Sequence, residues 1–212
     1  MGRTFYLPSG VTLDIDAPKI QKFPLEDLLL LLAKEKRFYN TSDWSVLEHS
    51  LACYLAGEQL FPDNHNLLKH LLFHDLHEAL IRDIPSFMKT EDFREMEDYV
   101  SGRLMEALEI EPLASEDKPY LKMIDVVMAF IEAYSMLNIE LAEAIGASIH
   151  ETVADKQLLM FVILSCQKAF DYVASFDGPY TAFNPDESRP DYIEFDLNPN
   201  IVNVFKQVAE NY

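Results

Sequence analysis

Hydrophobic and polar positions alternate with a period of two only near the start of the chain. Residues 4–7 (Thr-Phe-Tyr-Leu) and 11–15 (Val-Thr-Leu-Asp-Ile) resemble short strands, and the Pro-Ser-Gly sequence at 8–10 contains turn-forming residues. This pattern predicts a β-hairpin over residues 4–16.

From residue 24 onward the apolar residues recur at helical spacing. Pro24 and the acidic residues Glu26 and Asp27 are typical of a helix start, whereas Lys34 and Arg37 complement the dipole at its end. Further helices are predicted from Asp43 or Ser45 to about Phe61, and over about 66–82, 92–108, 118–144, 155–176 and 201–211.

The segments between these helices have the composition of loops. Residues 112–119 begin and end with Pro, and residues 178–190 carry Gly, Pro, Asp and Asn, which predicts an irregular segment. No internal repeat is visible. We therefore expect one all-α domain over residues 1–212, in which 1–20 form the hairpin and lead-in and 177–212 form an irregular segment with a final helix.

The chain is strongly acidic, with a formal net charge of −19, and 49% of its residues are hydrophobic. The hydrophobic content suits a filled core. The charge argues against nucleic acid as a partner, because binding to phosphate backbones requires clustered Lys and Arg. A small phosphorylated substrate is still compatible, since a bound cation can dominate the field inside a pocket.

The remaining composition predicts an intracellular protein. Cys53 and Cys166 lie in apolar helical segments and are interpreted as buried, reduced thiols. Residues 28–33 are apolar but too short to span a bilayer, and the residues after Arg3 lack the apolar core of a signal peptide. We expect no membrane partner and a cytoplasmic location, or the host cytoplasm if the protein is viral.

The most informative sequence is His-Asp-Leu-His-Glu at residues 74–78, with His49 upstream and Asp125 downstream. Divalent transition metals accept mixed imidazole and carboxylate ligands. Two neighbouring residues of a helix are about 100° apart, so a metal could lie over the common edge of His74 and Asp75. The four side chains His49, His74, Asp75 and Asp125 therefore predict a metal site.

Two further carboxylates lie at helical spacing from these donors. Glu78 is one turn beyond His74 and Asp75, where it could transfer the proton of a water that the cation acidifies. Glu132, seven residues after Asp125, could orient one of the metal ligands without binding the metal itself. His70 and His77 share a face with His74, but a three-histidine site is the weaker hypothesis, and His77 is expected to form hydrogen bonds.

Several motifs resemble those of HD-domain phosphohydrolases. Residues 45–50 (Ser-Val-Leu-Glu-His-Ser) resemble S-V-A-E-H-S, and residues 72–79 contain the H-D-x-x-E-A motif. Residues 83–89 are similar to the D-[IL]-P-x-x-x-K element that follows it, and the spacing from Asp125 to Glu132 matches a further helix of the family. The resemblance covers about residues 4–135.

This resemblance implies an all-α HD helical bundle and hydrolysis of a phosphomonoester or phosphoanhydride. It implies one divalent transition metal (Co, Mn, Fe, Ni or Zn) at His49, His74, Asp75 and Asp125, with Mg as a second, substrate-associated ion. Metal-bound water would attack phosphorus, with Glu78 as acid and base. The chain is similar in particular to bacterial 5′-deoxynucleotidases and small phage dATP triphosphohydrolases.

The residues expected to bind substrate follow from the same resemblance. Arg37 and Phe38 occupy the place of an Arg-aromatic pair that lines the nucleotide site, and Lys89 could bind phosphate. Phe38 and Trp44 could stack on a base or pack in the core. Asp83 is a candidate catalytic residue that could contact a sugar hydroxyl, or it could simply end a helix. Residues 39–41 lack the Gly-His of many relatives, and Trp44 replaces a Tyr, so substrate preference is not carried over.

The sequence thus predicts a hydrolase that removes phosphate groups from 2′-deoxynucleotides. It is either a dNTP triphosphohydrolase, with dATP a leading candidate, or a dNMP 5′-nucleotidase, and it acts as a homo-oligomer. Alternatives are an HD hydrolase of cyclic nucleotides or alarmones, and a non-catalytic HD assembly module, which would be expected to lack a ligand or Glu78.

Overall fold

The computed structural model describes residues 3–20, 23–84, 88–136, 138–152, 155–175 and 205–207. The chain starts with a two-stranded antiparallel sheet of β1 (Thr4–Tyr6) and β2 (Thr12–Asp14), in which Phe5 pairs with Leu13. Gly10 adopts a φ of +82° in the turn, a value that favours glycine. The predicted hairpin is therefore confirmed.

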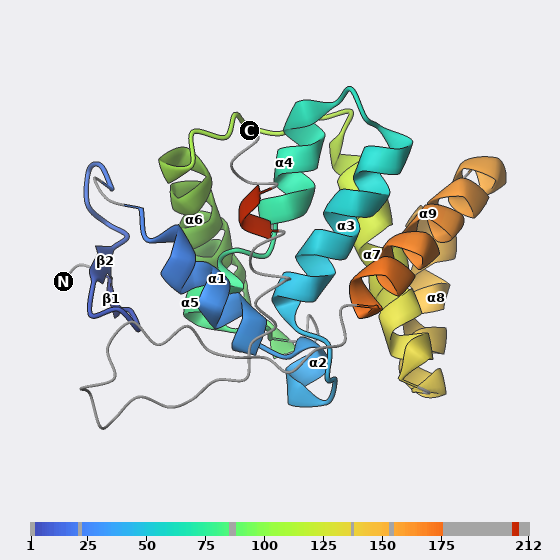
Figure 1. Cartoon of the computed structure of the whole chain (residues 1–212), viewed down its shortest axis with the longest axis horizontal. Coiled ribbons are helices and arrows are strands. Elements are labelled where there is room, and N and C mark those ends of the chain that lie inside the picture. The colour runs from blue at the N-terminus through green and yellow to red at the C-terminus, as the bar shows by residue number, and fades with distance from the viewer. Residues whose placement is uncertain are drawn as a thin grey trace.

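Helices make up most of the remaining described chain (Figure 1). They are α1 (Leu25–Lys34), α2 (Arg37–Asn40), α3 (Val46–Leu60), α4 (His65–Phe73), α5 (Glu78–Ile81), α6 (Glu91–Ala107), α7 (Lys118–Ser135), α8 (Ile139–Thr152) and α9 (Lys156–Ala174). This architecture confirms the predicted helical fold with an N-terminal hairpin. Among the described helices, none combines the length and apolar character needed to cross a membrane.

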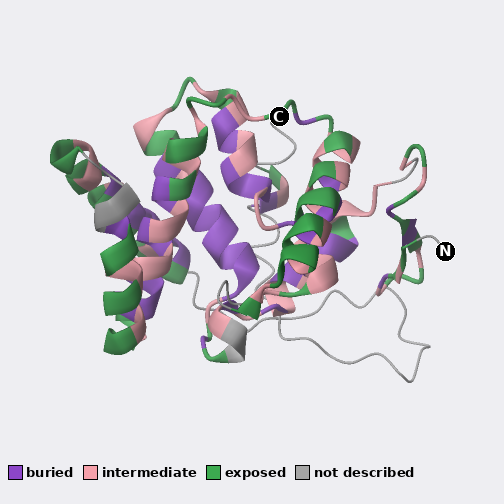
Figure 2. Cartoon of the chain, turned by 180° about the vertical axis from the view of Figure 1, so that it is seen from behind, coloured by how far each residue is buried: buried purple, intermediate pink, exposed green. Residues whose placement is uncertain are grey.

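Helix α3 lies at the centre of the bundle and packs against α1, α4, α7 and α9. Most of its residues are buried, from Val46 to Gly57, because apolar side chains surround it on nearly all faces. Helices α6, α8 and α9 bury one face and expose the opposite one, which appears in Figure 2 as helices that carry both purple and green residues. Functional side chains on α3 therefore project into the interior of the protein.

Gly57 lets α3 and α4 approach each other closely. A Cβ atom at this position would lie 2.3 Å from Leu71 Cδ1 and 3.1 Å from Leu68 Cδ2, both on α4. The close approach supports the contact between His49 of α3 and His74 at the end of α4, whose ring centroids are 5.4 Å apart.

Two of the predicted helices are interrupted, so these two predictions were wrong. The helix predicted over 66–82 stops at Phe73, and a turn at 74–77 separates α4 from α5. In this turn the imidazoles of His74 and His77 form hydrogen bonds with backbone carbonyl groups. His74 Nδ1 lies 2.9 Å from Leu71 O, and His77 Nδ1 lies 3.1 Å from His74 O.

The helix predicted over 118–144 is divided into α7 and α8. Asn138 caps α8, because its side-chain oxygen accepts a hydrogen bond from Leu141 N at 3.2 Å, a role that Asn favours at helix starts. Helix α8 then packs back against α7. The apolar periodicity continues through the break, which is why the sequence pattern did not reveal it.

The predictions for the C-terminal region fall largely outside the described residues. The irregular segment at 178–190 lies outside them entirely, and only 205–207 of the helix predicted over 201–211 are described, as helix. Phe205 is buried with its ring edge-on to Phe73 at 5.7 Å, and Lys206 Nζ is 2.5 Å from Glu26 Oε1. These residues therefore contact α4 and α1.

We predict that Gly57→Ala lowers the free energy of unfolding by about 1–3 kcal/mol, because the added methyl overpacks the contact with α4. Gly102, inside α6, is the matched control, since nothing lies within 4 Å of its Cβ position. Gly102→Ala should raise stability by up to about 1 kcal/mol through helix propensity. Urea denaturation of both variants measures the difference, and equal effects would contradict the close-packing argument.

Candidate active site

His49 is placed by the first turn of α3. Ser45 caps this helix in a capping box: its hydroxyl accepts a hydrogen bond from Glu48 N at 3.2 Å, and Glu48 Oε2 accepts one from Ser45 N at 2.6 Å. The box satisfies backbone donors that would otherwise be buried without partners. It fixes the start of the helix, and His49 follows one turn later with no exposed surface.

The orientation of the His49 ring is set by Glu132 of α7. Its Nδ1 lies 2.6 Å from Glu132 Oε1, so Nδ1 carries a proton and donates a hydrogen bond to this carboxylate. Nε2 then presents its lone pair to two other carboxylates, Asp125 Oδ1 at 3.3 Å and Asp75 Oδ2 at 3.7 Å. Glu132 lies beside a candidate ligand, as the sequence hypothesis of an orienting carboxylate requires.

The turn after α4 orients His74 in the same way. Its Nδ1 donates to Leu71 O, which leaves Nε2 unprotonated at 3.2 Å from Asp75 Oδ2 and 3.9 Å from Asp125 Oδ1. This Nε2 atom is buried without a hydrogen-bond partner among the described residues. A cation held between this nitrogen and the carboxylates would satisfy its lone pair, because buried polar atoms normally have a partner.

The spacing of these donors fits a divalent metal ion. Ligand atoms about 2.1 Å from an ion are separated by about 3.0 Å at right angles and about 3.4 Å in a tetrahedron. The four nitrogen–oxygen separations, from 3.2 to 3.9 Å, lie near this range. The structure thus brings together His49, His74, Asp75 and Asp125, the four ligands predicted from the sequence.

The two aspartates are held in the charged form that metal binding requires. Burial alone would raise the pKa of Asp75, but His74, when its imidazole is protonated, and the charge of Arg37 hold it well below its ordinary value. Burial likewise opposes ionisation of Asp125, whose pKa is lowered by a hydrogen bond from His49 when Nε2 of that imidazole is protonated, and by the charge of Lys122. Both carboxylates are therefore available as anionic ligands.

Arg37 is a buried cation beside the four candidate metal donors. Its Nε lies 3.3 Å from Glu132 Oε2 and its Nη1 lies 3.4 Å from Asp75 Oδ2. Burial alone would lower the pKa of Arg37, but the carboxylates of Glu132 and Asp75 raise it above its ordinary value. Glu132 therefore contacts both His49 and Arg37, one with each carboxylate oxygen.

Glu78 begins α5 and lies in the wall of the same site. It is 5% exposed, and its Oε2 has no hydrogen-bond partner among the described residues. Burial raises the pKa of Glu78 well above its ordinary value, and the charges of Asp75 and Asp83 raise it further. A carboxyl group in this condition can hold a proton near neutral pH.

Asp83 fixes the backbone of the segment between α1 and α3 (residues 35–45), which contains the short helix α2 and is called the Arg37 loop. Its Oδ2 accepts a hydrogen bond from Phe38 N at 3.1 Å, and Phe38 has a φ of +55°, which is uncommon for a residue other than glycine. Glu35 closes the same loop: its carboxylate lies 2.6 Å from Arg82 Nη1 and accepts from Asp83 N at 3.3 Å. The structure thus shows Asp83 in contact with the candidate substrate-binding loop.

A cavity of about 910 Å³ opens over the metal donors. Arg37, Phe38, Glu78, Asp83 and Lys89 all line it, together with His74, Asp75 and Asp125. Trp44 is not among the residues that line this cavity. Its ring stacks on Phe170 of α9, with the centroids 4.5 Å apart.

The other histidines face different partners. His70 Nε2 lies 2.9 Å from Glu111 O, and His77 Nε2 lies 3.6 Å from Glu97 Oε1. Lys89 Nζ lies 2.6 Å from the same Glu97 oxygen. His70 therefore makes a hydrogen bond away from the metal donors, and His77 joins an ion-pair group at the cavity wall.

Sequence reasoning missed three features of the site. Lys122 lines the cavity with its Nζ 2.9 Å from Asp125 Oδ2, and its i, i+3 spacing to Asp125 was an available signal. Cys53 lies one turn beyond His49, with its sulfur 3.5 Å from His49 Nε2. Apolar residues of α7 and α8 form one wall of the cavity. The sequence did not predict this wall, because its apolar pattern indicates a single helix over residues 118–144.

Comparison with known proteins agrees with this geometry. Residues 34–133 match the family model of the HD domain. The match supports an HD-domain family for this segment, a family that generally comprises metal-dependent hydrolases. The segment contains all four metal donors and both Glu78 and Glu132. No match was found among curated proteins. The match thus supports the resemblance to HD-domain proteins over this segment, whereas the likeness to 5′-deoxynucleotidases and phage triphosphohydrolases, the deoxynucleotide substrate and the homo-oligomer stay predictions.

We predict that Glu132→Gln weakens binding of a divalent metal about 10–100-fold, because a neutral amide oxygen replaces the anionic acceptor that orients His49, and the charge of Arg37 is less balanced. Titration of the metal-free protein with Mn²⁺ or Zn²⁺ measures the change. Glu140→Gln, at an exposed position of α8, is the control and should leave the affinity unchanged. Equal affinities for both variants would show that Glu132 does not act on the metal site.

Proposed function

We propose that this protein is a metal-dependent phosphohydrolase that removes phosphate groups from 2′-deoxynucleotides. The observation that carries the proposal is the convergence of His49, His74, Asp75 and Asp125 beneath a cavity whose wall contains Glu78. The intact set of donors and of the candidate acid argues against a non-catalytic module.

The four donors would hold one divalent cation. When bound, it would acidify a coordinated water and neutralise charge on a phosphoryl oxygen. Arg37 lies against Asp75 and is itself buried, so its charge acts through a medium poor in water, where it is worth more than at the surface. We assign Arg37 to stabilising the charge of a phosphoryl group beside the metal donors.

Glu78 is assigned to proton transfer. Its Oε2 is buried without a partner and its pKa is raised, so the carboxyl can take up the proton of the attacking water and return it to the leaving oxygen. Asp83 is assigned to holding the Arg37 loop through Phe38 N, and it also lines the cavity.

The cavity supports a nucleotide as substrate. Its volume of about 910 Å³ lies within the range of about 300–1,000 Å³ of small-molecule sites. Apolar side chains of α7 and α8 line one wall, namely Leu121, Val126, Ala129, Leu141, Ala144 and Ile145. Together with Phe38 they offer flat and apolar surface to a base and deoxyribose. We favour a purine, with dATP as a leading candidate.

The charges around the cavity affect how many phosphate groups the substrate can carry. Arg37, Lys89 and Lys122 all line it, but each already contacts a carboxylate. A triphosphate therefore requires positive charge beyond these three side chains, and a substrate-associated Mg²⁺ would supply it. A monophosphate makes no such demand.

We predict that the protein loaded with Mn²⁺ or Co²⁺ hydrolyses 2′-deoxynucleotides faster than ribonucleotides. A panel of dNMPs, dNTPs and their ribose counterparts, with products separated by chromatography, tests this. Inorganic triphosphate from dATP identifies a triphosphohydrolase, and orthophosphate from dAMP identifies a 5′-nucleotidase. A metal-loaded protein that is inert toward every nucleotide of the panel would refute the proposed function.

We predict that Glu78→Gln lowers kcat about 10²–10⁴-fold, because the amide cannot accept and return a proton. Metal content, measured by elemental analysis, should stay that of the wild type, since Glu78 is not among the four donors. Glu95→Gln, on the exposed surface of α6, serves as the control with unchanged kcat. Full activity of Glu78→Gln would exclude it as the proton carrier.

A further inference from the structure

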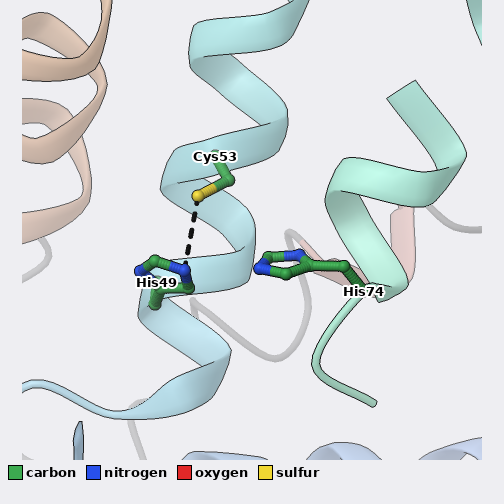
Figure 3. Close-up of side chains that lie close together, drawn as sticks. All are labelled: His49, Cys53 and His74. Atoms are coloured by element: carbon green, nitrogen blue, oxygen red, sulfur yellow. Dashed lines mark hydrogen bonds between the residues drawn. The ribbon is translucent and has the colours of Figure 1, made fainter. Parts of the chain in front are cut away.

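Cys53 lies on α3 one turn beyond His49 and on the same face of the helix (Figure 3). Both side chains are completely buried, and the sulfur is 3.5 Å from His49 Nε2. This nitrogen is the atom that also faces Asp75 and Asp125. The thiol and the two carboxylates are therefore directed at the same donor atom.

The sulfur has the spacing of a metal ligand. One donor atom from each of His49, Cys53 and His74 can be chosen so that all three lie within 4.8 Å of one another. In a tetrahedral site with Zn–S of about 2.3 Å and Zn–N of about 2.1 Å, sulfur and nitrogen are about 3.6 Å apart. The separation of 3.5 Å between Cys53 Sγ and His49 Nε2 agrees with this value.

A second observation points to a ligand at this place. His74 Nε2, which belongs to the same cluster, is buried and has no hydrogen-bond partner among the described residues. Its ring is directed from the end of α4 toward α3, where His49 and Cys53 lie (Figure 3). A cation between the three side chains would satisfy this nitrogen and give the thiol a role beyond packing.

Cys166 provides the contrast within the same chain. It is equally buried, on α9, but its sulfur lies 3.9 Å from the backbone oxygen of Ile124 and, within the described part of the chain, belongs to no cluster of candidate ligands. A buried thiol in this fold therefore does not by itself point to a metal. The distinguishing feature of Cys53 is the pair of imidazole nitrogens around it.

We propose that Cys53 is a further ligand of the metal, as a thiolate beside His49, His74 and the two aspartates. The inference rests on the metal site of the proposed function and extends it. Formation of the sulfur–metal bond releases the thiol proton to solvent. Because a thiolate is a soft donor, it shifts the preference of the site toward zinc and cobalt and away from Mg²⁺ and Mn²⁺.

Cobalt spectroscopy tests the proposal without reference to activity. Wild-type protein and Cys166→Ala, each loaded with one equivalent of Co²⁺, are expected to show the intense near-ultraviolet absorption of sulfur-to-cobalt charge transfer. Cys53→Ala should lose this absorption. Its affinity for Zn²⁺ relative to Mn²⁺ should fall by roughly tenfold or more, as expected for loss of a direct ligand.

X-ray absorption at the zinc edge of the wild-type protein makes the test independent of how the variants fold. A sulfur at about 2.3 Å from zinc supports the proposal. If bound zinc has only nitrogen and oxygen neighbours and bound cobalt lacks the charge-transfer band, Cys53 is a packing residue and the proposed hydrolase is unaffected. If the wild-type protein binds neither metal, the ligand proposal and the proposed function both fail.

Discussion

The buried carboxylate of Glu132 is the interaction on which the site depends. It has no exposed surface, and its two oxygens contact His49 Nδ1 at 2.6 Å and Arg37 Nε at 3.3 Å. An anion in the interior is costly unless it is paired and hydrogen-bonded. The imidazole and the guanidinium that satisfy Glu132 are held in place by it in turn, so one carboxylate determines which His49 nitrogen faces the candidate metal site and where the positive charge of Arg37 lies.

The same pairing connects parts of the chain that are distant in sequence. Glu132 belongs to α7, His49 to the capped start of α3, and Arg37 to the loop that Asp83 holds through Phe38 N. Displacement of any of these segments would separate a charge from its partner in a medium of low dielectric constant. The pairing of Glu132 with His49 and Arg37 therefore reinforces the apolar packing of the helices. It acts at the candidate site, where the proposed chemistry requires a fixed geometry.

The sequence predicted those parts of the fold and the site that depend on local patterns. Helical periodicity located the helix around His49, and motif spacing identified the four donors that the structure brings together. The break after Phe73 and the capping by Asn138 depend on side-chain hydrogen bonds within a continuous apolar pattern, which periodicity does not register. Trp44 stacks on Phe170 through a contact more than a hundred residues apart in sequence, so no local signal could have placed it.

The acidity of the chain has a consequence at the cavity itself. Its three lining cations each contact a carboxylate, and Glu97 and Asp98 add further acids. An anionic phosphate meets little net attraction there until a divalent cation is bound. In the proposed hydrolase the metal would therefore govern substrate binding as well as the chemical step. Because such coupling is reciprocal, a bound phosphate would strengthen metal binding by the same factor, so an acidic cavity would make both events cooperative and restrict hydrolysis to the metal-loaded protein.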